Sequence, residues 1–88
     1  MERIYFDNSA TTKPLPEAVA AMTRALCETW ANPSSVHGAG IEARALVEES
    51  RRCAARALGV RRDTEGRVIF TSSGTEADNL AILGTVYA

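Results

Sequence analysis

The stretch VIFTSSGTEADNLAI, residues 68–82, changes its hydrophobic pattern in the middle. Residues 67–71 are apolar and β-branched, which is typical of a short buried strand. Apolar residues then recur at helical spacing from Ala77 onward. Ser73 and Glu76 fit a capping box, in which the serine oxygen accepts from a backbone N–H and the glutamate reaches back. The pattern predicts a strand, a tight turn at residues 72–75, and a helix that continues to Ala88.

Upstream of this stretch the chain predicts one more strand and two more helices. Residues 3–7 are rich in strand formers, and a polar loop follows at residues 8–12. An amphipathic helix is expected at residues 16–29, with Pro16 in its first turn. After a loop, a long helix is expected from Ile41 to Leu58, capped by Gly59. Its expected apolar stripe consists of Ala43, Leu46, Val47, Ser50, Ala54 and Ala57.

The predicted order is therefore strand, helix, helix, strand, helix. Two strands make a poor sheet, and a strand that is buried on both faces needs further neighbours. The pattern indicates the opening part of a larger α/β protein with a mostly parallel sheet. The same reasoning makes us expect an incomplete domain in these 88 residues.

Composition excludes several classes of function. The formal net charge of −1 argues against a nucleic-acid-binding module. No stretch reaches the roughly 20 apolar residues of a membrane helix, and the first residues lack a leader pattern, so a cytoplasmic protein without a membrane partner is expected. No metal-ligand spacing is present, and Cys27 and Cys53 are predicted to be reduced thiols in the core. Arginines interleaved with glutamates at residues 42–62, including a Glu48–Arg52 pair, predict a solvated helix face.

The predicted turn at residues 72–75 has the chemistry of an anion site. The first N–H groups of a helix lack partners and carry the positive end of its dipole, and phosphate is their usual ligand. A simple capped turn is the alternative interpretation. The P-loop and Rossmann motifs are absent, which favours a compact phosphorylated cofactor over a nucleotide. His37, the single histidine, lies in a Gly- and Ser-rich loop, where it is either functional or merely solvent-facing.

Three segments, YFDNSATT at residues 5–12, NPSSVH at residues 32–37 and FTSSGTEADNL at residues 70–80, together resemble the start of the cysteine desulfurases. These enzymes belong to the class V aminotransferase group of pyridoxal-phosphate enzymes. The resemblance implies the large α/β aminotransferase architecture (PLP fold type I), a mostly parallel sheet with flanking helices in a homodimer. Residues 1–30, 31–66 and 67–88 would be successive parts of that domain.

The resemblance also implies roles for particular residues. Gly74 and Thr75 would bind the phosphate of pyridoxal 5′-phosphate, although the family often has Ala where Gly74 stands. Asn8, Ala10 and His37 would lie towards the substrate. The implied reaction takes sulfur from L-cysteine, leaving L-alanine and an enzyme persulfide. A sulfur-acceptor or scaffold protein of iron–sulfur cluster assembly or thiolation would receive that sulfur.

The resemblance places the catalytic residues of the family outside this stretch of sequence. The cofactor-binding lysine, the acid that pairs with its ring nitrogen, the substrate-binding arginine and the persulfide cysteine all follow later in the family. Lys13 is the single lysine here and matches none of them. An N-terminal fragment without catalytic residues of its own is thus expected. The alternatives are part of another class V enzyme, such as a selenocysteine lyase or an aminotransferase, or a non-catalytic module that binds a phosphate compound or a protein.

Overall fold

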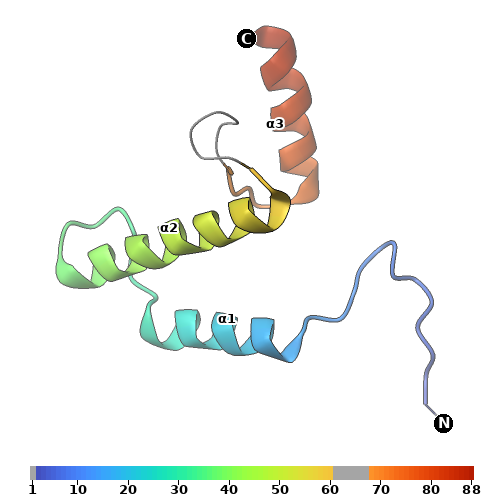
Figure 1. Ribbon diagram of the computed structural model, residues 1–88, viewed down its shortest axis with the longest axis horizontal. Coiled ribbons are helices and arrows are strands. Elements are labelled where there is room, and N and C mark those ends of the chain that lie inside the picture. The colour runs from blue at the N-terminus through green and yellow to red at the C-terminus, as the bar shows by residue number, and fades with distance from the viewer. Residues whose placement is uncertain (1, 61–67) are drawn as a thin grey trace. The chain divides into compact units, whose positions relative to one another are not determined.

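The computed structural model describes residues 2–60 and 68–88. Its helices are α1 (Pro16–Glu28), α2 (Gly38–Leu58) and α3 (Gly74–Tyr87), as Figure 1 shows in chain order. The chain divides into two compact units, Met1–Arg44 and Ala45–Ala88, and each is described by itself below.

The predicted strands are wrong for the part of the chain that the structure describes. Residues 3–7 are irregular, as are residues 68–71, and no strand occurs within residues 2–60 or 68–88. Residue 67 and the predicted polar connection at residues 61–66 lie outside the described residues. A strand exists only when its backbone bonds to a neighbouring strand. The apolar, β-branched sequence is therefore present without the sheet that it would join.

Helix α1 agrees closely with its prediction of residues 16–29. Pro16 occupies the first turn, where a missing N–H costs nothing, and Glu17 lies beside the positive end of the helix dipole. The cap residue Thr29 donates its backbone N–H to Ala25 O over 3.1 Å. The apolar residues that make this stretch amphipathic, Leu15, Val19, Met22 and Leu26, are all exposed.

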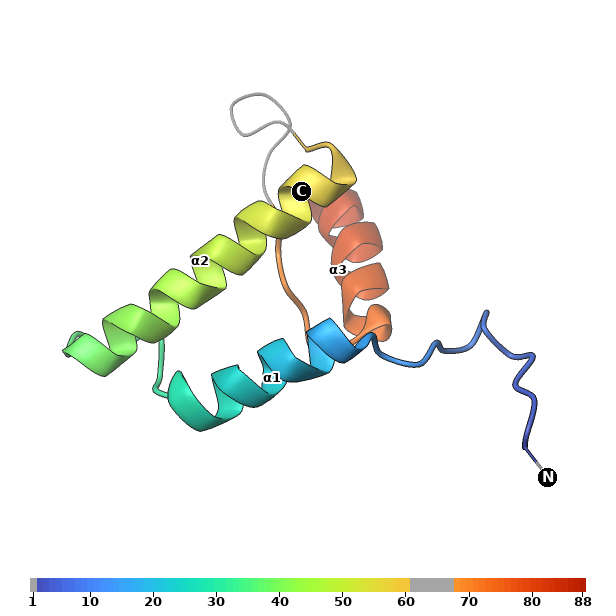
Figure 2. The same cartoon turned by 60° about the horizontal axis from the view of Figure 1, so that its bottom comes forward.

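Helix α2 begins at Gly38, three residues before the expected start at Ile41, and it ends as predicted at Leu58. Figure 2 shows it as one continuous helix. Gly59 adopts a φ of 72°, the left-handed conformation that glycine tolerates best. Its N–H bonds to Arg56 O at 3.2 Å, and Val60 N–H bonds to Ala55 O at 2.9 Å. These two bonds form a Schellman motif, so the predicted glycine cap is confirmed.

The buried face of α2 differs in part from the predicted stripe. Ala43 is buried, and Val47 and Ala54 are half-buried, as expected. The other predicted members, Leu46, Ser50 and Ala57, are exposed. Arg51 is half-buried in line with Ala43 and Val47, which lie eight and four residues before it.

Arg51 attaches α2 to the segment that precedes α3. Its Nε donates to Val68 O over 2.9 Å, and its guanidinium lies 5.4 Å from the ring centroid of Phe70. Both a hydrogen bond and a cation–π contact therefore hold this segment. The prediction that the arginines form only a solvated face is wrong for Arg51, because its planar fork can bond and stack at the same time.

Two more predictions, one for an ion pair of α2 and one for the two cysteines, need correction. Glu48 pairs with Arg51, and Glu49 pairs with Arg52 at 2.7 Å, so the expected Glu48–Arg52 pair does not form. Both Cys27 and Cys53 are exposed rather than in a core. Both thiols lie on helix faces that no described element covers, and helical spacing alone cannot show which apolar positions will be covered.

Candidate functional site

The start of α3 is built by a serine cap. Ser73 is extended, with φ −165° and ψ 165°, and its Oγ accepts from Glu76 N over 3.1 Å. Ala77 N–H then bonds to Ser73 O at 3.0 Å, which closes the first turn. The serine half of the predicted capping box is confirmed.

The glutamate half of the capping box is displaced by one residue. The Glu76 carboxylate accepts from the backbone N–H of Ser72 at 3.1 Å and from the Ser72 hydroxyl, instead of from Ser73 N–H. The hydroxyl of Ser72, followed by its backbone N–H, lowers the pKa of Glu76 below its ordinary value, because both donors stabilise the carboxylate. Glu76 thus holds residues 72–76 in a closed loop.

Two backbone donors remain open at this turn. The N–H groups of Gly74 and Thr75 make no hydrogen bond to any of the residues that the structure describes, and the Thr75 hydroxyl makes none either. Both residues are exposed, and beyond the adjoining residues and the backbone of α3 itself no heavy atom lies within 4 Å of the place where a Cβ on Gly74 would stand. These donors lie at the positive end of the α3 dipole. The residues present therefore fit a phosphate group.

The loop at residues 32–37 is held by its own hydrogen bonds. Asn32 Oδ1 accepts from Ser34 N over 2.9 Å, and Asn32 O accepts from Ser35 N over 3.0 Å. Arg44 Nε donates to Pro33 O over 3.0 Å. A Cβ on the buried Gly40 would lie 2.5 Å from Ser35 O, so the loop lies directly against α2. The sequence analysis did not predict this close contact at Gly40, although a glycine in the first turn of a helix can indicate that another segment packs closely against it.

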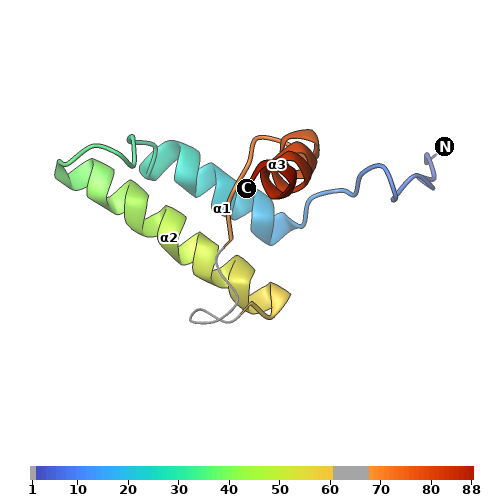
Figure 3. The ribbon, with the colours of Figure 1, turned by 90° about the horizontal axis from the view of Figure 1, so that it is seen from above.

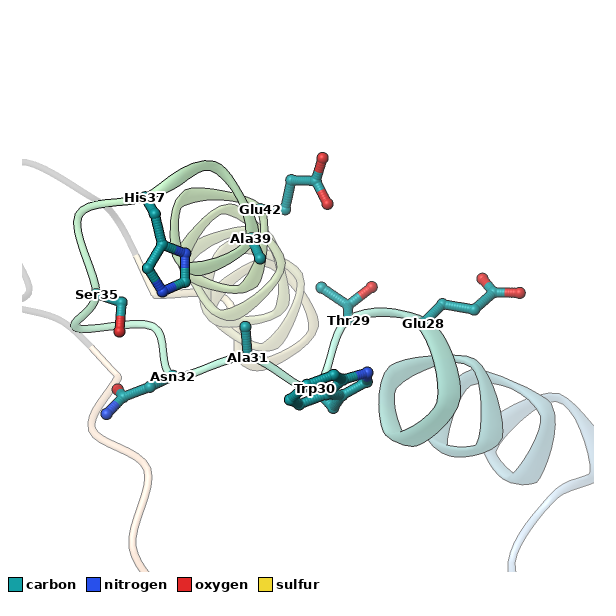
Figure 4. A pocket seen from close by; sticks show the side chains of 9 residues that line it. All are labelled: Glu28, Thr29, Trp30, Ala31, Asn32, Ser35, His37, Ala39 and Glu42. Carbon is teal, nitrogen blue, oxygen red and sulfur yellow. The ribbon is translucent and has the colours of Figure 1, made fainter.

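His37 occupies the N-cap position of α2. Its Nδ1 accepts from Gly40 N over 3.3 Å, and its carbonyl accepts from Ile41 N over 3.0 Å. The imidazole lines a pocket of about 480 Å³ between the end of α1 and the start of α2. Figure 4 shows the side chains around it, which are Glu28, Thr29, Trp30, Ala31, Asn32, Ser35, Ala39 and Glu42.

Asn8 and Ala10 lie in a turn near the start of the chain. Asp7 O accepts from Ala10 N over 3.0 Å and from Thr11 N over 3.3 Å. Tyr5 Oη donates to the same carbonyl over 2.9 Å. This turn and His37 belong to the first unit, whereas Gly74 and Thr75 belong to the second. The structure thus describes the predicted site residues as three separate local arrangements.

Within residues 2–60 and 68–88, no group of three or more His, Cys, Asp or Glu side chains could hold a metal ion. None of the helices in these two stretches is long and apolar enough to cross a membrane.

The turn before α3 and the sequence segments around it point to one family. The aminotransferase class-V family model matches residues 4–88. The chain therefore belongs to the aminotransferase class-V family. No solved structure matches the chain.

Curated relatives extend this comparison. The chain is 48% identical to a NifS/IcsS protein homolog of Lactobacillus delbrueckii subsp. bulgaricus over 97% of its length, and 48% identical to a cysteine desulfurase of Cereibacter sphaeroides over 100%. It is also 43% identical to a selenocysteine lyase of Xenopus tropicalis over 96% of its length. The chain spans only 21%, 22% and 19% of these three relatives.

Proposed function

We propose that this chain is the N-terminal, phosphate-binding part of a pyridoxal-phosphate-dependent cysteine desulfurase. The observation that carries the proposal is the turn at Gly74 and Thr75, whose N–H groups have no hydrogen-bond partner among the described residues, in a chain of the class-V family. A relative with the name cysteine desulfurase, identical at 48% of positions, supports the choice of reaction. The reaction would convert L-cysteine to L-alanine and leave the sulfur as an enzyme-bound persulfide.

Each residue of the turn would have a defined task. The backbone N–H groups of Gly74 and Thr75 and the Thr75 hydroxyl would donate to the cofactor phosphate. Glu76 would keep the turn in shape through Ser72, because its carboxylate already accepts two hydrogen bonds there. When bound, the cofactor supplies an electron sink for breaking bonds next to the amino group of the substrate. We further propose that Asn8, Ala10 and His37 lie on the substrate side.

The proposal extends to partners and compartment. A homodimer and a protein that accepts the sulfur or scaffolds its transfer are the partners we propose, again by analogy with the family. The cytoplasm is the compartment we propose. Both cysteines are free thiols, as is usual in reducing compartments.

A selenocysteine lyase is the second candidate function. Selenocysteine lyases of Xenopus tropicalis and Homo sapiens are 43% and 40% identical to the chain. Assays of the full-length protein with L-cysteine and with L-selenocysteine separate the two functions. A desulfurase forms alanine from both or from cysteine alone, whereas turnover of selenocysteine only would favour the lyase.

Thr75 provides the direct test of the phosphate site. In the full-length protein, Thr75→Val removes a hydroxyl donor to a charged acceptor, which we expect to weaken cofactor binding by about 1.5–3 kcal/mol, or roughly 10- to 150-fold. Equilibrium dialysis followed by absorbance of the retained cofactor measures this change.

Thr85→Val is the matched control for this experiment. Thr85 also lies in α3, and its hydroxyl donates to Ala81 O over 2.6 Å, within the same helix. Thr85→Val should leave cofactor affinity unchanged. Equal affinity of the Thr75→Val variant and the wild type would contradict the assignment of Thr75.

A further inference from the structure

The guanidinium group of Arg51 makes three contacts at once. Its Nε donates to Val68 O over 2.9 Å, and its Nη1 donates to the carboxylate of Glu48 on the same helix. Its Cζ lies 5.4 Å from the ring centroid of Phe70. The Arg51 side chain is only 29% exposed. Arg51 is thus fixed between its own helix, α2, and the segment that precedes α3.

Arg51 supplies the hydrogen bond that attaches residues 68–71 to α2. The segment forms no strand, and among the described residues no other hydrogen bond joins it to that helix. Val68 is half-buried where Arg51 bonds to it, while Ile69 and Phe70 are exposed. An irregular segment keeps one conformation only where such contacts offset the entropy of ordering it. The position of this segment therefore depends on Arg51.

The attached segment leads directly into the candidate phosphate turn. Thr71 Oγ1 donates to Ser73 O over 2.9 Å, and the same carbonyl accepts from Ala77 N over 3.0 Å in the first turn of α3. Ser72 is held by the carboxylate of Glu76. Hydrogen bonds and peptide bonds therefore connect the guanidinium group to the start of α3, all within the second compact unit of the chain.

We propose that Arg51 is a positioning residue for the cofactor phosphate. By holding the segment before the turn, it sets the direction in which the N–H groups of Gly74 and Thr75 point. A site made of backbone donors binds an anion most tightly when the donors are in place before the anion arrives. This inference rests on the proposed function, because it names a residue that supports the phosphate site of that function.

Arginine suits this task better than lysine does. Its planar group can donate a hydrogen bond and lie against an aromatic ring at the same time, whereas an ammonium group is a compact point charge. Arg51→Lys therefore keeps the charge of the residue but loses the simultaneous bond to Val68 and contact with Phe70.

The test compares two ligands that differ in the phosphate. Pyridoxamine 5′-phosphate and pyridoxamine bind without a covalent bond, and equilibrium dialysis of the full-length protein, freed of cofactor, gives both affinities. Their ratio measures what the phosphate contributes. In Arg51→Lys we expect this ratio to fall about fivefold, because a cation–π contact and a hydrogen bond each contribute a factor of that order. The affinity for pyridoxamine should stay close to that of the wild type.

Two further variants test the contact itself. Arg52→Lys is the matched control, because Arg52 is the next residue of α2 and bonds to Glu49 at 2.7 Å within the same helix, so its ratio should equal that of the wild type. Phe70→Leu removes the ring and should lower the ratio. In the double variant Arg51→Lys/Phe70→Leu, the two losses should be less than additive, because both break the same contact.

The outcomes separate this inference from the proposed function. A wild type that binds both ligands equally would overturn the phosphate site and, with it, the role of Arg51. A wild type with a large ratio that Arg51→Lys leaves unchanged would overturn the role of Arg51 alone. Equal losses for both ligands in Arg51→Lys, or an equal fall of the ratio in Arg52→Lys, would show a general structural effect and would also overturn that role.

Discussion

Glu76 is the residue on which the shape of the candidate phosphate turn depends. Its carboxylate accepts both the backbone N–H and the hydroxyl of Ser72, while its own N–H is accepted by Ser73 Oγ. The donors of these three bonds belong to Ser72 and Glu76. Among the described residues, the N–H groups of Gly74 and Thr75 have no acceptor. A negative side chain beside an anion site would ordinarily repel the anion, but this carboxylate is already engaged by two donors.

The lowered pKa of Glu76 gives the turn a definite pH dependence. A carboxyl group with a folded-state pKa below its unfolded value contributes stability above the unfolded pKa and loses it as the pH falls through the folded pKa. We therefore expect the Ser72 amide resonance of the chain to titrate at a pH below the ordinary range of glutamate, with fraying at the start of α3. NMR of the amide protons measures both effects.

Glu76→Gln supplies the control for this titration. The variant keeps an acceptor for Ser72 but cannot titrate, so the inflection should vanish and the Ser72 amide should stay at one position. An inflection that persists in Glu76→Gln, or one that occurs above the ordinary glutamate range in the wild type, would contradict the assigned hydrogen bonds.

At the residue scale, hydrogen bonds between near neighbours in the sequence could be predicted, whereas contacts between distant residues could not. The Ser73 cap and the Gly59 cap depend on neighbours within a few residues, so their spacing in the sequence was enough to predict them. The roles of His37 and Arg51 went unpredicted. A histidine cap is rare, and Arg51 bonds to Val68, 17 residues away. For Gly74 and Thr75, the sequence predicted the phosphate role, which stays a prediction.

At the scale of whole elements, the three helices follow from the sequence and the sheet does not. Helices close their backbone hydrogen bonds internally, so periodicity and caps suffice to define α1, α2 and α3. A strand takes its hydrogen bonds from another segment, and residues 3–7 have no such neighbour in the described chain. The family assignment supports the aminotransferase class, while the parallel sheet remains a prediction for the whole domain.

Two glycines in helices should respond in opposite directions to the same substitution. Gly40→Ala would place a Cβ 2.5 Å from Ser35 O and 2.8 Å from Asn32 O, both backbone atoms that cannot give way cheaply. We expect it to destabilise the start of α2 by about 1–3 kcal/mol. Gly84→Ala adds a methyl group that meets nothing within 4 Å beyond the adjoining residues and the backbone of α3 itself, and it should stabilise α3 by up to about 1 kcal/mol.

Helix content by far-ultraviolet circular dichroism, together with amide exchange at each helix, measures this pair of effects. Gly84→Ala serves as the control for the general helix propensity of alanine, which both substitutions share. A gain of helix in Gly40→Ala as large as that in Gly84→Ala would show that the loop at residues 32–37 does not lie against Gly40.

In the part of the chain that the structure describes, nearly all of the large apolar side chains are exposed. Ala43 is the one buried hydrophobic residue in the described part of the chain. Trp30 is 75% exposed, and the large apolar residues of α3, including Leu80, Ile82 and Val86, are exposed on every side of the helix that Figure 3 views end-on. A helix that is apolar all round is typical of one buried in a larger protein.

This imbalance predicts how the 88-residue chain behaves in solution. Burial of apolar surface is the main source of stability, so helices with almost nothing buried should form without fixed tertiary packing. We expect a helical far-ultraviolet spectrum, a weak near-ultraviolet signal, strong binding of the dye ANS and a broad thermal transition. Trp30 should emit at a wavelength close to that of free tryptophan.

The same measurements on the full-length protein provide the control, in which the dye should no longer bind strongly and the transition should sharpen. A sharp cooperative transition of the 88-residue chain, with a blue-shifted Trp30, would mean that its apolar faces pack against one another or against a second copy.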